Sequence, residues 1–100
     1  MKVRQVVFSV EAEAELLEIY DWIADETAPD VALAYVVRVQ EFCQRLEVGS
    51  ERGRSRDDIR PGLRIIGFER RITIAFVVEP ERVVILRLFY AGRDWENLLT

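Results

Sequence analysis

Residues 63–90 read LRIIGFERRITIAFVVEPERVVILRLFY, and this stretch decides the fold. It contains three runs rich in Ile, Val and Phe, which is the composition of β-strands. The runs are Leu63–Phe68, Arg71–Val78 and Arg82–Tyr90. Glu69-Arg70 and Glu79-Pro-Glu81 separate them at the distances that hairpin turns require. The stretch therefore predicts an antiparallel meander of three strands.

Two amphipathic helices are predicted on the N-terminal side of this meander. Ser9 offers an N-cap oxygen, and apolar residues recur at helical spacing over about residues 10–26. The other face of that helix carries acidic side chains, which we expect to be solvated: Glu11, Glu15, Glu18 and Asp25. Pro29 suits the first turn of a second helix, whose apolar face continues to Leu46. The short link between the two predicts an antiparallel helix hairpin.

The remaining segments complete the expected architecture. A strand is predicted over about residues 2–8, residues 50–62 form an irregular connection, and Arg93–Leu99 add a helical turn. The order β-α-α-β-β-β predicts an α+β fold, an antiparallel sheet with the helix hairpin on one face. A length of 100 residues predicts one domain, 1–100.

Composition narrows the class of function. The net charge of −4 argues against direct, specific nucleic-acid binding, although the charge is uneven: residues 1–50 carry −6 and residues 51–100 carry +2. The chain has no histidine, and Lys2 is its only lysine. Cys43 is a lone cysteine, which fits a reducing cytosol. Asp57 and Asp58 adjoin without further ligands. We therefore expect a cytoplasmic protein with no catalytic residue, cofactor, metal or membrane span.

Both faces of the predicted sheet carry apolar residues. On the predicted strand Arg71–Val78, one face carries Ile72, Ile74, Phe76 and Val78, and the other face carries Ala75 and Val77. On the last strand Val83, Ile85, Arg87 and Phe89 share one face, and Val84, Leu86, Leu88 and Tyr90 share the other. Two helices cover only one face, and large exposed apolar patches usually mark interfaces. The pattern thus predicts that something outside the chain covers part of the second face.

Three motifs resemble those of ParE-like toxins in the RelE/ParE superfamily, and together they span nearly the whole chain. The first is Ser9-Val-Glu-Ala-Glu-Ala14 with Ile19-Tyr-Asp-Trp-Ile23, which looks like the opening helix of the family. The second is Gly53-Arg-Ser-Arg-Asp-Asp-Ile-Arg-Pro-Gly-Leu-Arg64, similar to its central loop. The third is Ile85-Leu-Arg-Leu-Phe-Tyr-Ala-Gly-Arg-Asp94, similar to its last strand. Tyr90 stands where many relatives have histidine.

The resemblance implies the toxin of a bacterial type II toxin–antitoxin pair, associated with inhibition of DNA gyrase and neutralised by a ParD-like antitoxin. Candidates for target binding are Arg87, Tyr90, Arg93 and Trp95, residue types that are enriched at interface hot spots. The alternative is that Arg87 balances an acidic neighbour and Trp95 packs the tail. Candidates for antitoxin binding are Trp22, Ala75, Val77 and Phe89.

Two other functions stay open from the sequence. The first is ribosome-dependent messenger RNA cleavage as in RelE-like toxins, which requires an acid, a base and cations. Arg87 and Arg93 supply cations, but no histidine is available as the base. The second is a non-toxic homologue that acts only in complex with its antitoxin. The arginine-rich loop around Asp57 and Asp58 is expected to be neutralised by its own ion pairs.

Overall fold

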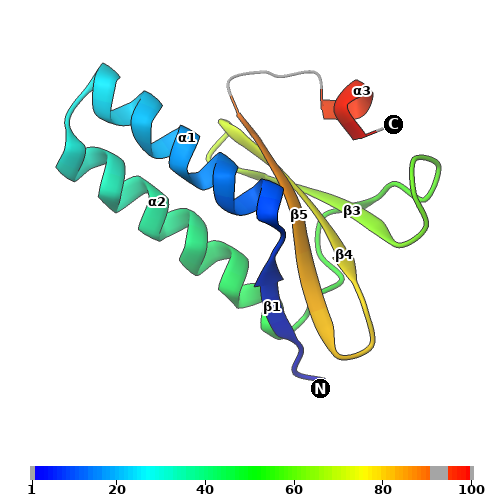
Figure 1. Ribbon diagram of the computed structural model, residues 1–100. Helices are drawn as coiled ribbons and strands as arrows, with labels where there is room; N and C mark the ends of the chain where they lie inside the picture. The colour runs from blue at the N-terminus through cyan, green and yellow to red at the C-terminus, as the bar shows by residue number, and fades with distance from the viewer. Residues whose placement is uncertain (1, 91–94, 100) are drawn as a thin grey trace.

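The computed structural model describes residues 2–90 and 95–99. In chain order its elements are β1 (Gln5–Phe8), α1 (Val10–Glu26), α2 (Pro29–Gln44), the 3₁₀-helix η1 (Arg45–Glu47), β2 (Arg54–Ser55), β3 (Leu63–Phe68), β4 (Ile72–Val78), β5 (Arg82–Tyr90) and α3 (Trp95–Leu99). Helices α1 and α2 form a hairpin beside the sheet (Figure 1). The α+β fold with this hairpin on one sheet face is confirmed.

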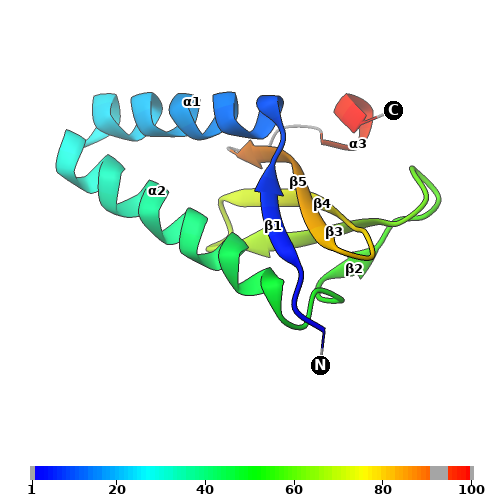
Figure 2. The ribbon, with the colours of Figure 1, turned by 60° about the horizontal axis from the view of Figure 1, so that its bottom comes forward.

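The sheet has the strand order β1-β5-β4-β3-β2. The pairs β3–β4 and β4–β5 are antiparallel, which confirms the meander. Strand β1 instead pairs in parallel with β5, from Gln5 beside Arg82 to Phe8 beside Ile85 (Figure 2). The expectation of a purely antiparallel sheet is therefore wrong. A hairpin turn forces antiparallel pairing only between strands that follow each other, and the two helices and the other strands separate β1 from β5.

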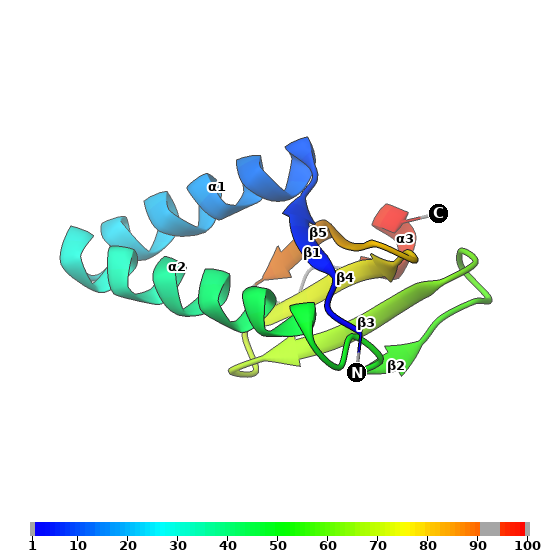
Figure 3. The ribbon, with the colours of Figure 1, turned by 90° about the horizontal axis from the view of Figure 1, so that it is seen from below.

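A short edge strand interrupts the predicted irregular connection. Arg54 pairs with Ile65, and Ser55 pairs with Arg64, so β2 extends the meander at its open edge (Figure 3). Gly53 precedes it with φ +73°, and a Cβ at this position would lie 2.3 Å from the Ile65 carbonyl oxygen. Only glycine permits so close an approach of the two backbones. A strand of only two residues is too short for a period-2 pattern to reveal it.

The helix ends follow the sequence. The Ser9 hydroxyl oxygen accepts a hydrogen bond from the Ala12 amide at 3.0 Å, and Pro29 opens α2. The inward residues of both helices form one core with the sheet. It includes Ala12, Leu16, Ile19, Ile23, Ala32, Tyr35, Val39, Cys43, Ile72, Ile74, Phe76, Val83, Ile85 and Leu88. In the described part of the chain, none of the helices has the length and apolarity to cross a bilayer.

The faces of β4 follow the prediction, but those of β5 change midway. Ala75 pairs with Arg87 while the next residue, Phe76, pairs with Ile85, so Leu86 is an extra residue in β5. Such a bulge inverts the alternation beyond it. Leu88 therefore joins Val83 and Ile85 against the helices, whereas Phe89 packs on the opposite face. The predicted grouping of Phe89 with Val83 and Ile85 is wrong for this reason.

The second face of the sheet carries a smaller core, which the chain covers itself. Leu63, Ile65, Ala75 and Phe89 are buried there, and the partly buried residues packed on them are Ile59, Val77, Leu86, Trp95 and Leu99. Helix α3 lies on the side of the sheet away from the α1–α2 hairpin (Figures 1 and 3). The chain itself therefore buries Ala75 and Phe89, which are 0% and 2% exposed, and the prediction that something outside the chain covers part of this face stays a prediction.

Burial makes Cys43 a structural thiol, as the sequence suggested. Its side chain is fully buried on α2, and burial raises the pKa of the thiol to about 12. We expect the folded protein to resist alkylation at pH 8, because almost no thiolate forms and the reagent cannot reach the sulfur. Labelling followed by mass spectrometry checks this, with denatured protein as the positive control. Rapid labelling of the folded chain would contradict the buried placement.

Candidate protein-interaction sites

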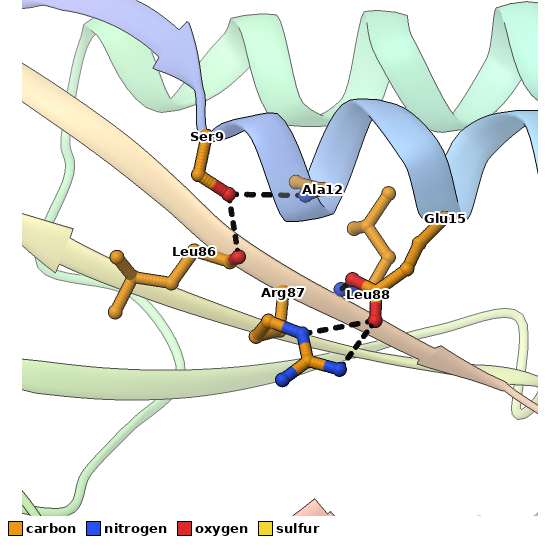
Figure 4. Close-up of polar contacts among 6 residues, drawn as sticks. All are labelled: Ser9, Ala12, Glu15, Leu86, Arg87 and Leu88. Carbon is orange, nitrogen blue, oxygen red and sulfur yellow. Dashed lines mark hydrogen bonds and ion pairs between the residues drawn. The ribbon is translucent and has the colours of Figure 1, made fainter. Parts of the chain in front are cut away.

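Strand β1 pairs with β5 only as far as Phe8, and beyond that point Ser9 and α1 make the contacts along this edge of β5. The Ser9 amide donates to the Ile85 carbonyl at 2.9 Å, and the Ser9 hydroxyl donates to the Leu86 carbonyl at 2.7 Å. Six residues later, nearly two helical turns along, the Glu15 carboxylate reaches the same edge of the strand (Figure 4). Its Oε1 accepts from the Leu88 amide at 2.8 Å. The side chains of Ser9, the N-cap of α1, and of Glu15 on α1 thus satisfy backbone groups of β5 that have no neighbouring strand.

Arg87 completes this arrangement. Its Nε and Nη2 donate to Glu15 Oε2 at 2.9 and 2.7 Å, and its guanidinium carbon lies 4.8 Å from the centre of the Phe89 ring. The hydrogen bond to Glu15 raises the pKa of Arg87. Glu15 is 6% exposed, so its expected place on a solvated acidic face is wrong. The alternative that Arg87 balances an acidic neighbour has geometric support.

Tyr90 and Trp22, predicted for two different partners, lie against each other. Their ring centres are 5.1 Å apart, at an interplanar angle of 53°. Trp22 is 38% exposed and Tyr90 is partly buried. They border a small recess at the end of the sheet, whose other lining residues are Ile19, Ile23, Tyr35, Arg71 and Ile72. The two residues are 68 positions apart in the sequence, so helix periodicity alone does not reveal that they lie together.

Trp95 lies on the other side of the sheet, in contact with the arginine-rich loop. The Arg56 guanidinium carbon is 5.2 Å from its ring centre, and Arg56 Nη2 is 3.0 Å from a Glu96 carboxylate oxygen. Arg56 also binds Asp58 through two hydrogen bonds of 2.9 and 2.8 Å, and this contact holds the pKa of Asp58 below its usual range. The loop is thus partly neutralised by its own ion pair, and it also holds α3.

The four target-binding candidates do not form one described cluster. Arg87 and Trp95 both adjoin Phe89 and its small core, whereas Tyr90 packs with the helix-side core. Arg93 lies outside the described residues. The antitoxin candidates also separate, since Trp22 is on α1 and the other three are on the far sheet face. The roles predicted for these eight residues stay predictions.

The structure has a groove between α1 and α2 that the sequence patterns did not predict. It has a volume of about 510 Å³ and is lined by Phe8, Glu13, Leu16, Leu17, Tyr20, Leu33, Val36 and Gln40. Leu17 is 70% exposed and Leu33 is 57% exposed, although both are large and apolar. Arg38 is the only Lys or Arg among residues 10–44, against nine Asp and Glu. Leucines outside the inward helix faces are the signal that could have revealed the groove.

The contacts of Arg56 with Trp95 and Glu96 predict that this arginine holds α3 against the sheet. Replacing it by glutamine removes the contacts to Trp95 and Glu96, so we expect α3 to leave the sheet more often. Trp95 fluorescence should shift to the red, and amide exchange at Leu63 and Ile65 should accelerate. Arg54→Gln, an exposed arginine on β2, is the matched control. Equal spectra and exchange in the two variants would show that Arg56 does not hold α3.

Residues 6–95 match the model of the family described as the ParE toxin of the type II toxin–antitoxin system parDE. The chain belongs to the ParE toxin family. The sequence resemblance is therefore confirmed, and the chain is a toxin of a type II system. No curated protein sequence matched it in the comparison.

A solved structure shows the same ParE-like fold. It is a chain of the chromosomal ParDE TA system from P. aeruginosa, with a TM-score of 0.78 and 26% sequence identity. The match covers 90% of this chain and 98% of that chain. Within residues 2–90 and 95–99, no group of three or more Cys, Asp and Glu side chains is placed to hold a metal ion.

Proposed function

We propose that this ParE toxin inhibits DNA gyrase by binding it in the cytoplasm and is held inactive by a ParD-like antitoxin. Membership of the ParE family supports the target, because ParE-like toxins are associated with gyrase inhibition. The groove between α1 and α2 supports the proposal that an antitoxin binds this chain. Leu17 and Leu33 line it and are more than half exposed, an arrangement that suits burial against another chain.

The groove fits an amphipathic helix of the antitoxin. A helix presents apolar residues at every third or fourth position, and such a stripe fills an apolar groove between two helices. Glu13 lines the groove, and the two helices around it carry an excess of acidic residues. Basic residues beside the apolar stripe would complement that charge and speed association. We therefore place the antitoxin on α1 and α2, and not on the sheet face of Ala75, Val77 and Phe89.

Inhibition by binding requires no bond-making residue in the toxin. RNA cleavage would need cations for the charge of the transition state. Arg87, the described candidate for that role, donates two guanidinium N–H groups to Glu15. The arrangement supports a structural role for Arg87 and favours gyrase binding over RNA cleavage.

Induction of the toxin without its antitoxin tests this proposal in cells. We expect growth to stop, with DNA breaks that depend on gyrase and activate DNA damage signalling. Co-expression of the cognate ParD-like antitoxin should restore growth. Codon-periodic cuts in mapped transcripts would instead identify a RelE-like ribonuclease. Unaffected growth would identify a non-toxic homologue.

A further inference from the structure

The apolar groove between α1 and α2 suits two kinds of occupant. Leu17 and Leu33 line it and are more than half exposed, and Val37, one turn beyond Leu33, is 39% exposed. An apolar surface of this kind suits burial against another protein. It also suits pairing with itself, because a second toxin turned by a two-fold axis presents the same residues. The residues that surround the leucines therefore decide between a partner helix and a second copy.

On α1, a carboxylate lies on either side of Leu17. Residues four positions apart lie on the same side of a helix, and Glu13 and Asp21 are four positions before and after Leu17. Both acidic side chains are exposed, and Glu13 lines the groove. The exposed leucine of α1 is thus flanked by negative charge along the helix.

Helix α2 repeats this arrangement. Asp30 is three positions before Leu33, and Glu41 is four positions after Val37. Both carboxylates therefore share the side of the helix that carries Leu33 and Val37, and both are exposed. With the pair on α1 they form what we call the acidic rim of the groove, which consists of Glu13, Asp21, Asp30 and Glu41.

The basic residues nearest in the sequence are engaged elsewhere. Arg38, the one Lys or Arg among residues 10–44, donates two hydrogen bonds of 3.1 Å to Glu69 in the turn between β3 and β4. The guanidinium carbon of Arg45 lies 5.9 Å from the centre of the Phe42 ring. Among residues 2–90 and 95–99, the salt bridges include none of the four carboxylates of the acidic rim.

This charge acts in opposite directions on the two occupants. In a two-fold pair of toxins, the acidic rim of one copy faces the same carboxylates of the other. Repulsion between exposed charges extends over about 10 Å at 0.1 M salt, which is also about the distance between the axes of two packed helices. A helix with Lys or Arg beside its apolar stripe is instead attracted by the rim. The rim therefore widens the difference in affinity between the two occupants.

We propose that the acidic rim selects the occupant of the groove. It prevents pairing of the toxin with a second copy, and it favours an amphipathic helix with basic residues beside its apolar stripe. The first part concerns the toxin alone. The identification of the basic helix with the antitoxin rests on the proposed function.

Sedimentation of the free toxin tests the selection against self-pairing. The rim variant carries Glu13→Gln, Asp21→Asn, Asp30→Asn and Glu41→Gln. The matched control removes the same charge at exposed positions that do not line the groove, and carries Glu18→Gln, Asp25→Asn, Glu26→Gln and Glu51→Gln. At about 0.1 M NaCl we expect monomers of the unaltered toxin and of the control, and dimerisation at least tenfold tighter in the rim variant.

Leu17→Lys, added to the rim variant, should restore the monomer and so place the contact in the groove. A monomeric rim variant would overturn the proposal. So would equal dimerisation of the control variant, because net charge and not the rim would then prevent pairing. A dimer of the unaltered toxin that Leu17→Lys disrupts would also contradict the proposal.

The rate of association with the purified antitoxin identifies the favoured occupant. At about 0.05 M NaCl we expect the rim variant to associate roughly tenfold more slowly than the unaltered toxin and the control, and at about 0.5 M NaCl we expect equal rates. If Leu17→Lys abolishes antitoxin binding while the rim variant associates at the unaltered rate, the charge does not select the antitoxin and the proposal is wrong. If antitoxin binding ignores Leu17→Lys while the rim variant dimerises as expected, the proposed antitoxin site fails and the selection against self-pairing stands.

Discussion

Replacement of Leu17 and Leu33 by lysine is expected to abolish neutralisation by the antitoxin while leaving the toxin folded. Both side chains line the groove between α1 and α2 and are largely exposed, so lysine is tolerated in the free protein. In the complex each lysine would be buried against an apolar and basic helix. Each change should cost about 2 kcal/mol or more, which is roughly 30-fold in affinity. The double variant should lose on the order of 1,000-fold if the two sites act independently.

Binding of the antitoxin to the variants by calorimetry checks this expectation. Val31→Lys is the matched control, because Val31 is also an exposed apolar residue of α2 but does not line the groove. Circular dichroism should show the same helix content in all variants. Unchanged antitoxin affinity in the double variant would place the antitoxin elsewhere, and the sheet face of Val77 would again be the candidate.

Replacement of Glu15 by alanine is expected to cause the largest loss of stability. It leaves the Leu88 amide without its acceptor and Arg87 without its counter-charge. Removal of one partner from a buried ion pair typically costs about 3–5 kcal/mol, and the partial exposure of Arg87 places this case near the lower value. Glu15→Gln keeps an amide oxygen as acceptor, and we expect a loss of about 1–2 kcal/mol.

Urea unfolding of the variants measures these losses. Glu18→Ala, at an exposed position of the same helix, should change the free energy of unfolding by less than about 0.5 kcal/mol. Arg87→Met distinguishes a structural role of Arg87, as the partner of Glu15, from a role in target binding. If Arg87 is structural, this variant loses stability together with toxicity. Full stability with lost toxicity would return Arg87 to the target-binding surface.

Local patterns predicted most of the fold. The alternation along β4, the cap at Ser9 and the proline at the start of α2 each depend on neighbouring residues, and the structure has all three. The faces of β5 were predicted wrongly beyond Leu86, because a bulge adds one residue without a signal in composition. The parallel pairing of β1 was missed because it joins segments that no turn connects.

The candidate sites were less predictable, because they depend on contacts between distant residues. Helical periodicity places Glu15 on the polar side of α1, and only the approach of β5 makes it a buried acceptor. Trp22 and Tyr90 appeared as separate candidates until packing brought their rings together. The cover of Phe89 by Trp95 depends on where α3 packs against the sheet. Leu17 and Leu33 were visible as leucines outside the core pattern, but their common groove required the crossing of two helices.

Titration of the purified toxin into a gyrase supercoiling reaction tests the central claim, that this toxin acts by binding to a protein. We predict that supercoiling stops, that cleaved DNA accumulates, and that the toxin needed for half-inhibition rises in proportion to the gyrase present. Such stoichiometry is the property of a tight binder and not of an enzyme. Full supercoiling activity in the presence of excess toxin would contradict the account.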